Sequence, residues 1–93
     1  MRSLLIFYLE DCGYCRKAKK AMAELLEEEP RFRAVAQKWI EESLEPELAD
    51  RYDYYAVPSV FADGEKLFEA HIGMSAEDIK RELRQALELA VSS

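Results

Sequence analysis

The chain alternates short apolar runs with stretches in which apolar residues recur at helical spacing. The apolar run at residues 3–9 is stopped by two acidic residues, which predicts a strand buried on both faces at the centre of a sheet. Residues 13–29 carry an apolar stripe of helical period without a proline, which predicts a helix. Cys12 and Cys15 therefore lie where the first strand leads into the first helix.

The middle of the chain fits two descriptions. The apolar positions of residues 32–44 recur at helical spacing, while the alternation over residues 35–41 fits one face of a strand. Periodicity by itself slightly favours the helix. Residues 46–52 begin with Pro46 and Glu47, which suit the first turn of a short helix.

The last third of the chain predicts a hairpin. Residues 57–62 and 65–72 flank Asp63 and Gly64, and this dipeptide is typical of a two-residue turn in which both residues take positive φ. Pro58 lacks an N–H, so it must lie at a sheet edge, at a strand start or in a cis turn.

A helix is predicted after Gly73. Ser75 and Asp78 have the spacing of a capping box, and an apolar stripe follows them. The exposed face carries opposite charges at i,i+4 spacing, expected to support the helix, in the pairs Glu77 with Arg81 and Arg84 with Glu88.

Composition and charge limit the function classes. A chain of 93 residues with 49% hydrophobic and 34% charged residues predicts one globular domain over residues 1–93. The net charge of −6 disfavours nucleic acid as a partner. The longest apolar run, residues 4–9, is too short for a signal peptide or a membrane helix. We therefore expect a cytoplasmic protein that does not bind membranes.

The two cysteines form a Cys-Gly-Tyr-Cys motif at a helix start. Free N–H groups and the positive end of the helix dipole stabilise a thiolate there, so Cys12 is the expected nucleophile of disulfide exchange. Cys15, one turn later, would then attack a mixed disulfide at Cys12. Two other interpretations are a pair of buried small side chains and a metal site. The chain has a single histidine, His71, and no second cysteine pair, so no metal is expected; His71 itself is expected to be an ordinary polar residue.

The charges of the first helix are reversed relative to its dipole. The basic residues Arg16, Lys17, Lys19 and Lys20 precede the acidic residues Glu24, Glu27, Glu28 and Glu29. This order costs stability in an isolated helix. Our hypothesis is that Arg16 and Lys19 favour the thiolate form of Cys12, against the opposing charges of Glu10 and Asp11; the alternative is a solvated surface without catalytic effect.

Pro58 is the second informative position. A cis bond between Val57 and Pro58 would expose the Val57 backbone to an extended substrate. The tyrosines before it, Tyr52, Tyr54 and Tyr55, are expected to pack between the short helix and the sheet; lining a substrate groove is the alternative.

The motifs Cys12-Gly-Tyr-Cys15, Val57-Pro58 and Ile72-Gly73, in this order, resemble the thioredoxin superfamily and, within it, the glutaredoxin branch, which has Tyr before the second cysteine. The resemblance implies an α/β thioredoxin fold of order βαβαββα, with a four-stranded mixed sheet flanked by three helices. It also implies a strand parallel to the first one, so we predict a strand at residues 34–40 rather than a helix.

The resemblance also implies roles for single residues. Cys12 would be the nucleophile, Cys15 the resolving thiol, Tyr14 a groove wall and Val57 the backbone partner of the substrate, with Pro58, Gly73 and Ser75 completing the substrate-binding set. Two features depart from the glutaredoxin pattern for binding glutathione. Glu10 and Asp11 replace a basic residue before the motif, and Gly73-Met-Ser75-Ala replaces a Gly-Gly segment followed by Asp. The helix start near Ser75 can still receive a carboxylate.

The expected function is that of a monomeric thiol–disulfide oxidoreductase without a bound cofactor. It would reduce protein disulfides or glutathione mixed disulfides, with glutathione as co-substrate or a reductase as electron donor. The alternatives are a thioredoxin-like protein-disulfide reductase recharged by a flavoprotein reductase, an iron–sulfur cluster carrier and a non-redox interaction domain.

Overall fold

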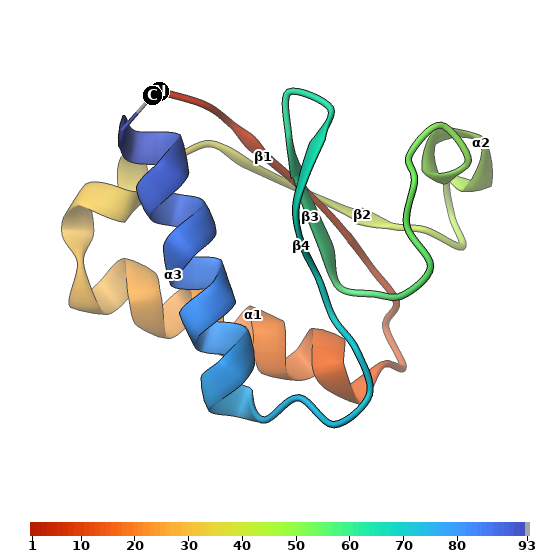
Figure 1. The fold of residues 1–93 in the computed structure, drawn as a ribbon, viewed down its shortest axis with the longest axis horizontal. Helices are drawn as coiled ribbons and strands as arrows, with labels where there is room; N and C mark the ends of the chain where they lie inside the picture. Colours follow the sequence, from red (N-terminus) through yellow and green to blue (C-terminus); the bar gives the residue numbers. More distant parts are fainter. Residues whose placement is uncertain (93) are drawn as a thin grey trace.

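The computed structural model describes residues 1–92, which form one mixed sheet with helices on both faces (Figure 1). The strands are β1 (Leu4–Tyr8), β2 (Gln37–Glu41), β3 (Ser59–Ala62) and β4 (Glu65–Glu69), in the spatial order β2-β1-β3-β4. The helices are α1 (Gly13–Glu28), α2 (Pro46–Ala49) and α3 (Ala76–Ser92), with a 3₁₀ turn η1 (Pro30–Ala34). β2 is parallel to β1, and β3 is antiparallel to both β1 and β4. The predicted element order and mixed sheet are confirmed.

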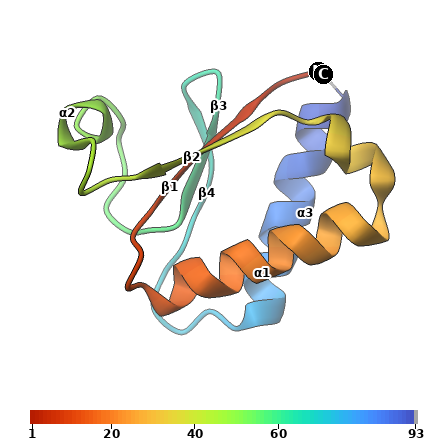
Figure 2. The same ribbon diagram turned by 180° about the vertical axis from the view of Figure 1, so that it is seen from behind.

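β1 lies at the centre because its side chains alternate between two apolar layers. Leu4 and Ile6 belong to the main core under α1 and α3, and Phe7 packs with Ile40 and Phe61 on the other face, beneath α2. Figure 2, seen from behind, shows α1 and α3 together on one side of the sheet and α2 alone on the other. Leu5 is only half-buried. The predicted burial on both faces is therefore incomplete where the short α2 covers the sheet.

Residues 32–44, whose pattern fits both a helix and a strand, contain both a 3₁₀ turn and a strand. A strand is present, as predicted, but it begins at Gln37 and not at residue 34. The residues before it form η1, whose Phe32 is fully buried in the main core. The helical spacing at the start of this segment thus reflects one 3₁₀ turn that places Phe32 inward.

The hairpin and the last helix follow their local signals. Asp63 and Gly64 both have positive φ, at 51° and 81°, as the turn type requires. Ser75 Oγ accepts a hydrogen bond from the Asp78 N–H, and Asp78 accepts one from the Ser75 N–H, both at 3.0 Å. The capping box is therefore present, and these bonds hold the pKa of Asp78 below its ordinary value.

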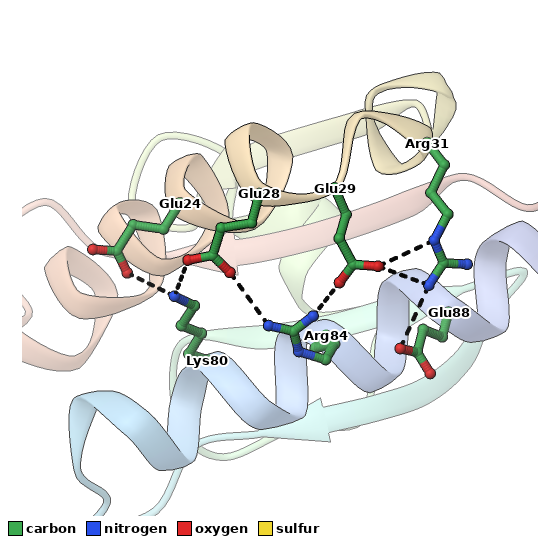
Figure 3. Close-up of polar contacts among 7 residues, drawn as sticks. All are labelled: Glu24, Glu28, Glu29, Arg31, Lys80, Arg84 and Glu88. Atoms are coloured by element: carbon green, nitrogen blue, oxygen red, sulfur yellow. Dashed lines mark hydrogen bonds and ion pairs between the residues drawn. The ribbon is translucent and has the colours of Figure 1, made fainter.

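The acidic end of α1 is matched by basic residues of α3, as Figure 3 shows. Lys80 Nζ lies 3.3 Å from Glu24 and 2.7 Å from Glu28, and Arg84 contacts Glu28 at 3.3 Å and also pairs with Glu29. The interhelical ladder consists of Glu24, Glu28, Glu29, Arg31, Lys80, Arg84 and Glu88. The cost expected at the acidic end of an isolated helix is thus offset by tertiary contacts.

The i,i+4 pairs predicted for the last helix are not formed. Within residues 1–92, Arg84 turns away from Glu88 toward the end of α1, and Arg81 pairs with Asp78 one turn earlier, at 3.1 Å. The two arginines therefore pair with carboxylates at the end of α1 and in the capping box, and not with the exposed glutamates one turn away on α3. Neither long helix in the described part of the chain has the apolar stretch that a membrane crossing requires.

Candidate redox active site

Cys12 caps the N-terminus of α1. Its backbone is extended, with φ −99° and ψ 122°, and its Sγ accepts a hydrogen bond from the Cys15 N–H at 3.4 Å. The Cys12 carbonyl accepts the Arg16 N–H at 3.1 Å, the first hydrogen bond of the helix. The Cys12 residue is partly exposed, and its sulfur thus occupies a position where helix N–H groups favour negative charge.

Cys15 lies on the inner side of the same turn. Its residue is 1% exposed, and its Sγ accepts the Leu9 N–H at 3.5 Å. Burial raises the pKa of the Cys15 thiol to about 12, and the adjacent Cys12 sulfur adds to this rise, while the Leu9 N–H and the Lys19 charge oppose it. At neutral pH Cys15 is therefore a protonated, inaccessible thiol beside a more exposed one.

The segment around Pro58 lies directly opposite Cys12. The Val57-Pro58 bond is cis, as the sequence suggested, and the Cys12 thiol donates a long hydrogen bond to the Val57 carbonyl at 3.7 Å. These residues are 45 positions apart in the chain. The Pro58 side chain is buried, and its carbonyl accepts the Ala70 N–H at 3.0 Å, which ties the bend to the residue that follows β4.

Glu69 secures the bend, and sequence reasoning did not identify it. Its carboxylate accepts the backbone N–H groups of Tyr55 and Ala56 and pairs with Lys66 at 2.8 Å. Burial by itself would raise the pKa of Glu69, but the bonds from Lys66 and the two N–H groups outweigh it and lower the pKa. No local signal marks this role, because it depends on how β4 pairs with β3.

Tyr14 joins α1 to the loop that precedes α3. Its hydroxyl accepts the Gly73 N–H at 2.9 Å, across 59 residues of sequence. Gly73 has φ 96°, a conformation that favours glycine. Figures 1 and 2 both show this loop running beside the start of α1. Tyr14 and Gly73 are thus brought to the cysteine motif, and their roles in substrate binding stay predictions.

The two predicted tuning residues differ in their surroundings. Lys19 pairs with Glu10 at 3.7 Å and lies over the Tyr8 ring, 4.0 Å from its centroid. Arg16 folds back over the first turn: a Cβ placed on Gly13 would lie 3.7 Å from the Arg16 guanidinium. The effect of either residue on Cys12 stays a prediction.

Ser75 is not placed beside the cysteines by any hydrogen bond within residues 1–92. Its hydroxyl accepts the Asp78 N–H at the start of α3, which leaves a capping role as the one that the structure shows.

The three tyrosines before Val57 differ in whether they pack against the sheet. Tyr54 stacks on Phe7 at 4.9 Å between ring centroids and donates a hydrogen bond to Glu42 at 2.7 Å. Burial and then Glu42 raise the pKa of Tyr54. Tyr52 packs edge-on against Phe61 at 4.9 Å. Packing is therefore confirmed for these two residues and wrong for Tyr55, which is 93% exposed.

Residues 1–92 contain no group of three or more His, Cys, Asp or Glu side chains that could hold a metal ion. His71 is exposed, and its Nδ1 lies 3.2 Å from the Ile72 carbonyl oxygen. A cluster-carrying form would need ligands from outside this chain.

Comparisons with known proteins agree with this geometry. The family model named Glutaredoxin matches residues 4–67. Among solved structures, a mutant thioredoxin from Halobacterium salinarum NRC-1 is 25% identical with a TM-score of 0.62, covering 97% of this chain and 74% of that one. Thioredoxin 1 from Thermosipho africanus TCF52B is 12% identical with a TM-score of 0.60, covering 94% and 96%. A malarial protein is 14% identical with a TM-score of 0.64, covering 91% and 96%. No curated protein matches the chain.

Proposed function

The chain belongs to the glutaredoxin family of thiol–disulfide oxidoreductases, and on this basis we propose that it reduces protein disulfides or glutathione mixed disulfides through Cys12 and Cys15. The observation that carries the proposal is the asymmetry of the two sulfurs. The Cys12 sulfur caps a helix and accepts an N–H at 3.4 Å, whereas the Cys15 residue is 1% exposed and holds its proton, with a pKa of about 12. Cys12 is therefore the proposed nucleophile, and Cys15 is the proposed resolving thiol that reacts afterwards.

The first step exchanges the disulfide bond of the substrate for a mixed disulfide with Cys12. The Cys12 thiolate attacks one sulfur of the substrate disulfide R–S–S–R′, the S–S bond breaks, and R–S⁻ leaves and takes up a proton. A mixed disulfide now joins Cys12 to R′. The Cys15 N–H, which donates to the Cys12 sulfur, holds that sulfur at the helix start during the attack.

The second step uses Cys15. Because the neighbouring Cys12 sulfur contributes to the raised pKa of Cys15, conversion of Cys12 into a mixed disulfide removes that contribution and makes Cys15 easier to deprotonate. Its sulfur attacks Cys12 Sγ, and R′–S⁻ leaves and takes up the proton lost by Cys15. The substrate has gained two electrons and two protons, and the protein carries a Cys12–Cys15 disulfide.

A reductant must then restore the dithiol. Two molecules of glutathione would supply the two electrons and form glutathione disulfide, and a flavoprotein reductase would supply them as the alternative donor. The exposed Glu10 and Asp11 and the engaged Ser75 hydroxyl favour testing both donors, since these positions lack the usual partners for the glutathione carboxylates.

The test uses three forms of the chain. The oxidised protein is offered glutathione or an NADPH-linked thioredoxin reductase, and recovery of free thiol is followed. In parallel, Cys15→Ser is incubated with a disulfide substrate, and we expect a mixed disulfide on Cys12, which intact mass identifies. Cys12→Ser, the matched control, should trap nothing. If neither donor reduces the protein and Cys15→Ser traps no partner, the proposal is wrong.

A further inference from the structure

The start of α1 carries cations that no carboxylate neutralises. Arg16, Lys17 and Lys20 are exposed and take part in no ion pair within residues 1–92; Lys17 Nζ lies over the Tyr14 ring, 5.2 Å from its centroid. The cations of the interhelical ladder, in contrast, all face carboxylates (Figure 3). Lys19, on the same turn, is engaged by Glu10. We call Arg16, Lys17 and Lys20 the α1 basic face.

Two of these residues lie in line with the reactive sulfur. Cys12, Arg16 and Lys20 are spaced at i, i+4 and i+8, which places them along one side of the helix. At about 1.5 Å of rise per residue, Arg16 and Lys20 lie roughly 6 and 12 Å along the helix axis from Cys12. Within residues 1–92 the remaining exposed cations without a carboxylate partner are Arg33 in η1, Lys38 in β2 and Arg51 in the loop after α2, so they are scattered over the fold.

Two exposed apolar side chains belong to the segments that meet the start of α1. Ile72 is 93% exposed, and the next residue, Gly73, is bonded to Tyr14 of α1. Tyr55 is also 93% exposed and lies two residues before Val57, whose carbonyl contacts the Cys12 sulfur. Exposed apolar groups beside a reactive centre are typical of a surface that a polypeptide covers.

We propose that the disulfide substrate is a polypeptide with acidic residues on one side of its reactive cysteine, which dock on the α1 basic face while an apolar side chain packs on Ile72. This inference rests on the proposed function and names its substrate class. Charge complementarity selects the occupant, because the cations beside Cys12 are unpaired in a chain whose net charge is −6. Of the two acidic residues before Cys12, Glu10 is paired with Lys19, and Asp11 is exposed. Near the sulfur the α1 basic face therefore sets three cations against the single carboxylate of Asp11, and at a Debye length of about 8 Å more distant carboxylates are largely screened.

The test compares peptides of one length, each with the same internal disulfide, in which the flanking residues are acidic, neutral or basic. We expect the wild-type protein to reduce the acidic peptide about five- to tenfold more efficiently than the basic one in kcat/KM, and this ratio to fall as salt increases. Arg16→Gln with Lys20→Gln should bring the ratio close to one. Lys38→Gln with Arg51→Gln removes the same charge elsewhere and should leave the ratio unchanged.

The ratio separates docking from an effect on the Cys12 thiolate, because a change in thiolate reactivity alters the rates for all peptides equally. Ile72→Ser should lower kcat/KM for the peptides but not for glutathione disulfide. Equal reduction of the three peptides by the wild type, or equal loss of the ratio in both double variants, would overturn the docking surface while leaving the oxidoreductase proposal in place. Absence of turnover with every disulfide would overturn the oxidoreductase proposal itself.

Discussion

The state of Cys15 provides the sharpest test of the site, and Cys12→Ser isolates it because Cys15 is then the only thiol. Burial raises its pKa from an ordinary 9.0 to about 12. Near pH 8 the thiolate fraction is then about 10⁻⁴, against about 10⁻¹ for the unfolded chain. Cys12→Ser removes the smaller contribution that Cys12 makes to the raised pKa of Cys15. Alkylation of Cys15 in the folded chain should therefore be about 100- to 1000-fold slower than in concentrated urea.

The assay follows addition of iodoacetamide by intact mass, with the folded and the urea-unfolded variant side by side. Cys15→Ser is the matched control: its remaining thiol, Cys12, belongs to a partly exposed residue at the helix start and should react at least as fast in the folded state as in the unfolded one. A folded Cys12→Ser chain that reacts within tenfold of its unfolded rate would contradict the burial and the raised pKa of Cys15. The assignment of the two sulfurs to attack and resolution would then lose its physical basis.

The same pKa has a consequence for stability. Since the folded value lies above the unfolded one, the stabilisation that accompanies burial of the neutral thiol is complete below about pH 9 and is lost as the pH rises toward 12. The slope is at most about 1.4 kcal/mol per pH unit. Cys15→Ala should therefore show a shallower alkaline decline in the free energy of unfolding than the wild type, and parallel declines would contradict the raised pKa.

Three further substitutions test contacts away from the sulfurs. Tyr14→Phe removes the acceptor of the Gly73 N–H and should lower the free energy of unfolding by about 1 kcal/mol in urea titrations. Gly64→Ala should cost about 1 kcal/mol through its φ of 81° alone, since no heavy atom lies within 4 Å of the added Cβ, and an unchanged Tm would refute this. Lys80 lowers the pKa of Glu28 below its ordinary 4.5, so this stabilisation is present above that pH and lost below it. Lys80→Met should flatten the decline of Tm in acid, and an unaltered acid decline would argue against the ladder.

Local patterns were sufficient for most of the elements and for the cysteine motif. The helix after Cys12, the Asp63-Gly64 turn and the capping box are specified by contacts between residues a few positions apart. Such contacts form wherever the local residues allow them, so their spacing in the sequence predicts them. The strand before Cys12 was predictable from its apolar run, although its partners β2 and β3 lie far away in the sequence. The strand at β2 was predictable only through the family resemblance, because its periodicity also fits a helix.

The sequence by itself thus determined which residues are the candidates for the chemistry, and tertiary structure decided what surrounds them. The contact of Cys12 with Val57, the support from Glu69 and the exposure of Tyr55 depend on how strands far apart in the sequence are paired. The reversed charges of α1 show the difference most clearly. A helix considered alone predicts a cost at its acidic end, but packing against α3 supplies the cations there, while Arg16, Lys17 and Lys20 have no ion pair within residues 1–92.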